Sequence, residues 1–512
     1  MLLYNAVEEQ LLINFPLGDH SMVLLDFASR QTVPLKKVFG EEESTYQNSL
    51  FVDNKGIYWQ NSPKGLTLVK VSKPIFSRYA KGYATRGLWA NDQHLVLQFR
   101  YVDFQQPDEV KRIEGLSRIQ SIFYQEKDEL WLGGSLGFVQ LDPVQLSIIN
   151  QYPVRSDHAI WSILRDQEGR WWGGLYQQGL LLKTPEDSIV RPYQQYGGFP
   201  ELQNSRVLQL VEEGPFLWAV TNRGLYLVHK EQGVIRRYWV DAEQDYQLPF
   251  EDIHFLHKDA DNVYWVATNA DGLVRFELDR ELKVKTHKRY TSDDDLSSNI
   301  LYAIVEDQFE NLWISSLNGL SCFNKKTEDV RVFLEEDGLT ELEFNRLSHF
   351  KDKKGRIYFG SIDGVVSFRP EDITVEEEYV APIRISELTV YNAKNEQLIE
   401  QDASNIKNIV LEPNARFFHL RVSMLDFFNV DRLRYSYKIE GLYDDYQSID
   451  GNTIELGGVP FGEYTLRVRG QSSDRRYSTE ELVIPLTVLR PVYYRWWFIL
   501  LVLSVLTATI VQ

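Results

Sequence analysis

Cysteine is almost absent from this chain of 512 residues, and cationic residues are scarce. The single cysteine, Cys322, excludes an internal disulfide and any zinc site built on cysteines. With 55 Lys and Arg against 73 Asp and Glu, the net charge is -18, and such a surface repels phosphate backbones. Nucleic acid is therefore not an expected partner. Only 3 Met accompany 12 Trp, 28 Tyr and 27 Phe, a balance that favours β-sheet over helix bundles.

Long apolar runs are missing except near the last residue. Met1–Phe15 is interrupted by Glu8 and Glu9, so no secretory signal is visible. Trp496–Val511, in contrast, carries no charge. As a helix it would measure roughly 24 Å, against ~30 Å for the hydrocarbon core of a bilayer. We expect residues 494–512 to form an incomplete transmembrane helix, the alternative being a buried C-terminal helix or strand.

A repeat with a period near 46 residues organises most of the chain. Its unit has an Asp six residues before a Trp, often with Gly or Asn between them, and then Gly-Leu six or seven residues later. Weaker copies contain Trp131, Trp218 or Tyr358. The clear copies pair Asp53 with Trp59, Asp166 with Trp172, Asp259 with Trp265, and Asp307 with Trp313.

Each unit contains about four short strand-like runs separated by turn residues. In one copy they are Val207–Glu212, Phe216–Thr221, Leu225–His229 and Val234–Val240. Four antiparallel strands in 40–50 residues, repeated seven or more times, are typical of β-propeller blades. The Trp is then a packing residue of the second strand, and the Gly before Leu occupies a turn that needs positive φ.

The repeat stops after Arg369-Pro370, and residues 380–490 contain strand-like runs of a different kind, typical of a β-sandwich. This segment includes Tyr435, Tyr437, Tyr443 and Tyr446, then Gly462-Glu463-Tyr464. A proline–aromatic run, Arg490–Phe498, leads into the apolar C-terminal segment.

The spacing of the blades resembles the two-component regulator propeller repeat of bacterial sensor kinases, and the tyrosine-rich segment resembles the triple-tyrosine domain that follows such propellers. One departure is Tyr446, where that family usually has Trp. The resemblance implies an all-β fold: a seven-bladed β-propeller over residues 71–375, with extra blade-like units at residues 1–70. These units would be either the end of a preceding propeller or part of a single larger wheel. An immunoglobulin-like sandwich would follow at residues 380–490. It also implies a periplasmic location and an inner-membrane anchor at the C-terminal segment.

Two motifs could carry chemistry, and the repeat explains both. Gly133–Gly137 matches G-x-S-x-G, but a nucleophile elbow needs a strand-to-helix turn. Asp259–Asn262 is rich in oxygen ligands, but its Asp is the turn residue of the repeat. We therefore expect no catalytic residue, no metal site and no cofactor.

The topology of a propeller predicts where a ligand would bind. The loop that enters the first strand and the loop between the second and third strands lie on the same face of the wheel, opposite the Asp turns. The candidate ligand-binding residues on this face are Trp161, Tyr176, Arg206, Asn222, Arg223, Asn269, Asp271, Asn345 and Arg346. The same face also collects His158, Gln177, Asn204, Asp252, His254, Asn299, Tyr302, Asn318 and Asp363.

Arginines, amides and aromatic rings of this kind suit hydroxyl-rich or carboxylated sugars, although many of the asparagines could instead cap turns. The leading hypothesis is an oligosaccharide-sensing region of a histidine kinase whose sandwich relays the signal and pairs two copies into a homodimer. The sugar class comes from the resemblance. The alternatives are a polysaccharide hydrolase or lyase, and a protein-binding scaffold.

Overall fold

The computed structural model of the chain describes most of its residues. They are 2–5, 10–14, 22–26, 32–34, 50–53, 57–62, 65–69, 75–116, 122–126, 129–154, 159–187, 189–194, 199–373, 382–392, 394, 396–402, 406–424, 433–471, 477–478, 480–494 and 496–511. His158 of the predicted face lies outside the described residues.

The chain divides into two compact units, Met1–Ser77 and Arg78–Gln512. The first unit contains two antiparallel sheets whose strands pair in sequence order, as the strands of a blade do. In the second of these sheets Asp53 accepts a hydrogen bond from the Trp59 indole at 2.9 Å. The sheets consist of β1 (Leu2–Asn5), β2 (Gln10–Asn14), β3 (Met22–Asp26) and β4 (Thr32–Pro34), and of β5 (Leu50–Val52), β6 (Tyr58–Ser62) and β7 (Gly65–Val69).

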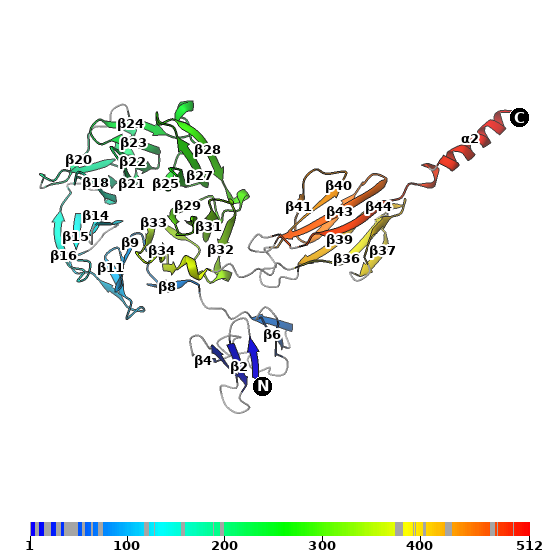
Figure 1. Cartoon of the computed structure of the whole chain (residues 1–512), viewed down its shortest axis with the longest axis horizontal. Helices are drawn as coiled ribbons and strands as arrows, with labels where there is room; N and C mark the ends of the chain where they lie inside the picture. The colour runs from blue at the N-terminus through cyan, green and yellow to red at the C-terminus, as the bar shows by residue number, and fades with distance from the viewer. Residues whose placement is uncertain are drawn as a thin grey trace. The chain divides into compact units, whose positions relative to one another are not determined.

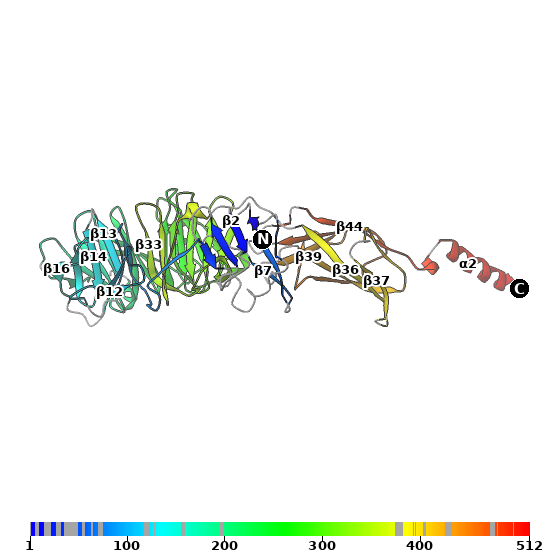
Figure 2. The same cartoon turned by 90° about the horizontal axis from the view of Figure 1, so that it is seen from below.

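The described residues between Ser77 and Phe368 form seven four-stranded sheets, which Figure 1 shows as blades around a common axis. In the edge-on view their strands run through the thickness of the disc (Figure 2). Written from the inner strand outward, blade 1 consists of β9 (Leu88–Ala90), β10 (His94–Leu97), β11 (Arg100–Asp103) and β12 (Val110–Arg112), and blade 2 of β13 (Ile122–Glu126), β14 (Glu129–Gly134), β15 (Gly137–Leu141) and β16 (Ile148–Tyr152). Blade 3 consists of β17 (Ile160–Arg165), β18 (Trp171–Leu175), β19 (Leu180–Lys183) and β20 (Arg191–Pro192), and blade 4 of β21 (Val207–Glu213), β22 (Phe216–Thr221), β23 (Gly224–His229) and β24 (Gly233–Tyr238). Blade 5 consists of β25 (Ile253–Lys258), β26 (Tyr264–Thr268), β27 (Leu273–Leu278) and β28 (Val284–Tyr290), and blade 6 of β29 (Leu301–Glu306), β30 (Asn311–Ser316), β31 (Leu320–Asn324) and β32 (Val330–Phe333).

Blade 7 closes the ring with a strand from the other end of the propeller. Its first three strands are β33 (Phe344–Lys351), β34 (Ile357–Ser361) and β35 (Gly364–Phe368), and its fourth is β8 (Ser77–Tyr79). Arg78 forms an ion pair with Asp363, whose other carboxylate oxygen accepts a hydrogen bond from the Gly82 amide. The closure therefore joins residues 285 positions apart in the sequence.

The Asp and Trp of the repeat form one hydrogen-bonded turn in each clear copy. In blade 3 one oxygen of Asp166 accepts from the Arg170 amide at 2.8 Å, and the other accepts from the Trp172 indole at 2.9 Å. Asp259 and Asp307 bind their Trp indoles at the same distance of 2.9 Å. The carboxylate thus satisfies both the turn and a buried indole N–H, which explains why the two residues recur at a fixed spacing.

The glycine of the repeat occupies the turn between the second and third strands, as predicted. Gly272 has φ +75°, and a Cβ there would lie 2.1 Å from the Tyr290 carbonyl oxygen. Both the backbone conformation and the close approach of the neighbouring strand therefore require glycine.

Short 3-10 turns connect the later blades. Those before the inner strands of blades 4 to 7 are Pro200–Asn204, Gln244–Tyr246, Ser292–Asp294 and Glu335–Asp337, and Pro370–Asp372 follows blade 7. Apolar clusters lie between neighbouring blades, and the repeat tryptophans Trp172 and Trp218 are buried in them. Trp313 is also buried, and its ring packs on Phe333 and Phe368. The predicted packing role of the Trp is confirmed.

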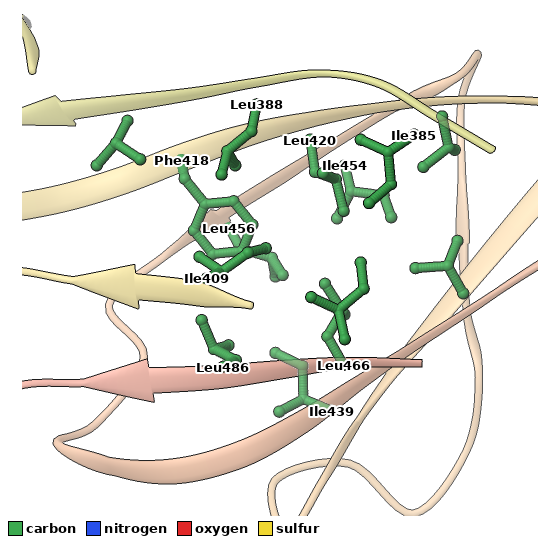
Figure 3. Close-up of a cluster of buried hydrophobic side chains, with 14 of the residues drawn as sticks. Ile385, Leu388, Ile409, Phe418, Leu420, Ile439, Ile454, Leu456, Leu466 and Leu486 are labelled. Carbon is green, nitrogen blue, oxygen red and sulfur yellow. The ribbon is translucent and has the colours of Figure 1, made fainter. Parts of the chain in front are cut away.

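Residues 382–488 form a separate β-sandwich of two sheets. A cluster of buried aliphatic side chains and Phe418 fills the space between the sheets (Figure 3). One sheet has the order β37 (Gln397–Asp402), β36 (Ile383–Asn392), β39 (Ala415–Met424), β42 (Thr453–Gly457). The other has the order β38 (Ile409–Leu411), β44 (Leu482–Val488), β43 (Gly462–Gln471), β40 (Arg434–Glu440), β41 (Gln447–Ile449).

The prediction of an all-β fold is confirmed, whereas that of a transmembrane helix is not supported. The apolar segment is helical as α2 (Trp496–Val511), after a 3-10 turn at Val492–Tyr494. It contains 16 residues. In the described part of the chain, no helix combines the length and the apolar character needed to cross a membrane.

Candidate functional site

The inner strands of five neighbouring blades are distorted near their N-terminal ends, where the chain enters each blade. The antiparallel register shifts by one residue at Trp161 in β17, Leu208 in β21, His254 in β25 and Tyr302 in β29. In β33 the shift is larger, because pairing stops at Phe344 and resumes at His349. Bulges of this kind redirect side chains and are frequent beside binding sites.

An aromatic pair extended by two arginines lies at this end of the inner strands. Trp161 and Tyr176 stack with their ring centroids 4.8 Å apart. The Arg86 guanidinium carbon lies 5.5 Å from the Trp161 ring centroid, and that of Arg206 lies 4.9 Å from the Tyr176 ring centroid. Arg86 precedes blade 1 and Trp161 belongs to blade 3, so their contact reaches past blade 2 toward the axis of the ring.

Blades 5 to 7 supply the other side of this region. Asp252 accepts a hydrogen bond from the Asn269 amide nitrogen at 3.1 Å. Burial raises the pKa of Asp252, although the charges of Arg346 and Arg206 act on it in the opposite direction. Both arginines therefore lie close enough to Asp252 to interact with it electrostatically. We refer to Arg86, Trp161, Tyr176, Arg206, Asp252, His254, Tyr302 and Arg346 as the axial mouth.

His254 is the most buried member of the axial mouth, with no accessible surface. Its Nδ1 lies 2.7 Å from the Leu301 carbonyl oxygen, which can only accept, so Nδ1 carries the proton. Burial and the Arg346 charge lower the pKa of His254 to about 4, and the neutral ring leaves Nε2 as an acceptor. Nε2 is buried and has no hydrogen-bond partner among the described residues.

Side chains of the inner strands meet further along the axis. The rings of Phe255 in blade 5 and His349 in blade 7 pack edge to face at 4.6 Å, reaching past blade 6. His257 lies 2.7 Å from a carboxylate oxygen of Glu306. These contacts join the inner strands of blades 5, 6 and 7.

The predicted asparagines serve mainly the backbone. Asn222 accepts a hydrogen bond from the Arg206 amide at 2.7 Å, and Asn345 donates to the Ser361 carbonyl at 2.8 Å. Asn269 binds Asp252, as described above. The three amides therefore link the entry loops to the hairpins between the second and third strands, and as ligand-binding residues they remain predictions.

Two other predicted residues lie beside the hairpin turns between the second and third strands. The Arg223 side chain is exposed, and its carbonyl accepts a hydrogen bond from Arg237 at 2.8 Å. Asp271 donates its amide to Thr268 at 2.8 Å, and burial raises the pKa of its carboxyl. As ligand-binding residues, both remain predictions.

Sequence reasoning missed Arg86. Its blade lacks the Asp–Trp pair of the repeat, so the start of the inner strand could not be located from the spacing. Arg86 is exposed and lies just before β9, so it could have been predicted only if the positions of the strands of blade 1 had been known.

The motifs that could have carried chemistry are part of the blade architecture. Gly133–Gly137 forms the hairpin between antiparallel strands β14 and β15, without the strand-to-helix turn of a nucleophile elbow. Asp259 binds the Trp265 indole and lies 3.4 Å from the Lys325 ammonium nitrogen. Among the described residues, no group of three His, Cys, Asp or Glu side chains is placed to hold a metal ion.

Comparisons with known proteins agree with this architecture. The family model for the Y_Y_Y domain matches residues 426–489. "Histidine kinase P4" of Formosa agariphila is 24% identical over 402 residues, which are 75% of this chain and 29% of the kinase. This chain thus spans less than a third of the length of that kinase.

A solved structure shares the fold. The extracellular domain of a hybrid two-component system from B. thetaiotaomicron matches with a TM-score of 0.71 at 16% identity, over 95% of this chain and 67% of its own. A second extracellular domain from that organism, also of a hybrid two-component system, has a TM-score of 0.47 at 15% identity, over 96% of this chain and 69% of its own. Residues 426–489 therefore belong to the Y_Y_Y domain family, and the chain as a whole has the fold of the extracellular domain of a hybrid two-component system.

Proposed function

We propose that this chain is the ligand-sensing, periplasmic part of a two-component histidine kinase, and that its axial mouth binds an oligosaccharide. The observation that carries the proposal is the cluster of bulged inner strands, which gathers an aromatic pair, arginines and a buried imidazole at one end of the ring axis. Sugars are bound by aromatic faces together with a few fixed polar groups, and the axial mouth supplies both.

The sandwich is proposed to relay the binding event through pairing of two copies. Its tyrosines are built into the domain: Tyr435 is buried and its hydroxyl accepts from the Met424 amide at 3.0 Å. Tyr446 and Tyr477 hold the Arg469 guanidinium between their rings, at 3.8 and 4.0 Å from the two centroids. A rigid domain of this kind can transmit a change in subunit arrangement without any chemistry of its own.

The test is a panel of purified oligosaccharides incubated with the whole chain, with thermal unfolding and release of reducing ends measured on the same samples. The proposal expects one class of sugar to raise the unfolding temperature without cleavage. It also expects Trp161→Ala to abolish that increase, while Trp239→Ala, which removes an aromatic ring that packs on Arg237, leaves it unchanged.

Two results would contradict the proposal. Sustained product release, lost on replacement of a single carboxylate, would support the hydrolase or lyase alternative. Absence of a thermal shift with every sugar of the panel would favour a protein-binding scaffold.

A further inference from the structure

The charge of the axial mouth differs from that of the chain. The chain as a whole carries -18, yet Arg86, Arg206 and Arg346 converge where Asp252 is the one partly buried carboxylate of the axial mouth. Glu251 and Glu343 lie near it but are exposed. A local cationic site attracts a small anion, which fits within the site. A polyanion such as nucleic acid would also contact the surrounding acidic surface and be repelled by it.

The guanidinium groups of this cluster also differ from other arginines of the propeller. Arg170, for example, binds Asp166, Glu168 and Glu231. Within the described residues, Arg206 and Arg346 use their guanidinium groups in no hydrogen bond or ion pair, and Arg206 is held by ring stacking on Tyr176. Each therefore retains the planar fork of N–H donors that pairs with two oxygens of a carboxylate or sulfate.

The backbone at Arg346 is specialised for its position. Residues 345–348 lie outside the ladder of β33, and Leu347 adopts φ +60°, an unfavourable conformation for a branched aliphatic residue. In a regular inner strand, the side chain of Arg346 would follow the alternation of side chains between the two faces of the sheet. The bulge releases Arg346 from this alternation. Its charge acts on the titration of Asp252, His254 and Tyr302.

His254 adds a requirement of a different kind. Its Nε2 is a buried acceptor without a partner in the described part of the chain. Because the ring has no accessible surface, a buried water rather than a group of the ligand would satisfy it. The axial mouth thus offers the ligand stacking faces and free anion-binding forks.

From this combination we propose that the ligand is an acidic oligosaccharide, whose carboxylate or sulfate group binds Arg206 and Arg346 while a sugar ring lies against Trp161 and Tyr176. This rests on the proposed function and narrows its ligand to one chemical class. The acid group is the shared chemistry of uronic acids and sulfated sugars.

The experiment measures binding of three size-matched probes to the whole chain by calorimetry: an oligogalacturonate, the same oligomer with its carboxylates reduced to alcohols, and a sulfated galactan oligosaccharide. At least one acidic probe should bind 10-fold or more tightly than the neutral one. Arg206→Gln and Arg346→Gln should each weaken that binding at least 10-fold. Arg236→Gln makes the same charge change on the exposed part of β24 and should have no effect.

The outcomes separate this inference from the proposed function. Tighter binding of the oligogalacturonate assigns a carboxylate, and tighter binding of the sulfated probe assigns a sulfate. Equal affinity for neutral and acidic probes, with loss only on Trp161→Ala, would overturn the inference and leave the proposed function standing. Acidic binding that survives both arginine substitutions would also overturn it. Failure of all three probes to bind would count against both.

Discussion

At the scale of single residues, the aspartate of the repeat accepts hydrogen bonds from both a turn amide and a Trp indole. The carboxylate of Asp166 is buried between the turn amide and the Trp172 indole, and it also receives the Arg170 guanidinium at 2.8 Å. Its role was predictable from sequence only in part. The spacing indicated a turn followed by a packed Trp, but the bond between them depends on where the indole edge lies.

Asp166→Ala should destabilise the propeller by about 1–3 kcal/mol, because it leaves a buried indole N–H and a turn amide without an acceptor. Ligand binding at the axial mouth should be unchanged in the folded fraction. Tryptophan fluorescence during urea unfolding measures the change, and Gln167→Ala at the neighbouring exposed position is the control. A loss below about 0.5 kcal/mol, the usual range of surface substitutions, would show that the turn does not need the carboxylate.

A second residue-scale prediction concerns His349, whose Nδ1 is buried without a partner among the described residues. Burial, together with the nearby His257, lowers its pKa to about 4. The unfolded chain therefore binds a proton between about pH 6.5 and 4 that the folded chain does not, so stability falls as the pH drops through this window. One such group contributes a slope of up to ~1.4 kcal/mol per pH unit.

His349→Phe should flatten this slope, and the matched change at His287, exposed on β28, should not. The measurement is the urea midpoint of the propeller at half-unit steps from pH 7.5 to 4. Because His254 has a similarly low pKa, part of the slope should remain in the variant. An unchanged slope would mean that His349 takes up its proton in the folded state.

At the scale of elements, the sequence predicted the blades well and the inner strands poorly. A repeat reports what every copy shares, which is the turn, the packed Trp and the glycine. The bulges at Trp161, His254 and Tyr302 are register shifts, and they depend on how two strands pair rather than on one strand's pattern. For that reason topology could predict which residues share one face, whose binding role stays a prediction, whereas the hydrogen bonds of Asn222 and Asn345 could not be predicted.

The closing strand gives the element-scale prediction. Gly364 begins β35 with φ +113°, and a Cβ there would lie 2.5 Å from the Tyr79 carbonyl oxygen of β8. Gly338 has a similarly positive φ of +92°, but no atom lies within 4 Å of its Cβ position. Both Gly→Ala changes strain the backbone, and only Gly364→Ala also pushes β8 away.

Gly364→Ala should therefore lower the stability of the propeller by at least ~1 kcal/mol more than Gly338→Ala. It should also speed hydrogen exchange at β8 and β35 in particular. Equal effects of the two variants on both measurements would show that the ring tolerates a displaced closing strand.

At the scale of the whole molecule, the proposed pairing of sandwiches can be tested with engineered cysteines. The native Cys322 interferes little, because burial raises its pKa to about 12 and keeps the thiol protonated. Val483 lies on the outward face of β44 with 50% of its surface exposed. In chains ending near Leu489, Val483→Cys should cross-link between copies, more so with bound ligand.

Val144→Cys is the matched control, since this exposed residue belongs to the propeller rather than the sandwich. It should cross-link weakly and without ligand dependence. A chain that stays monomeric at high micromolar concentration, with and without ligand, would contradict the pairing.

Because blade 7 contains both β8 and β35, the propeller ring can close only late in the synthesis of the chain. β8 leaves the ribosome before every blade, and its partner β35 follows after nearly 300 further residues, as the 285-residue separation of Arg78 and Asp363 shows. Bringing the ends of so long a segment together costs about 5 kcal/mol of chain entropy, which six finished blades have largely offset by then. Until β35 has been synthesised, β8 is an unpaired edge strand that can pair with another nascent chain. Dimers in which two propellers exchange their β8 strands would therefore form at this closure when nascent chains lie close together.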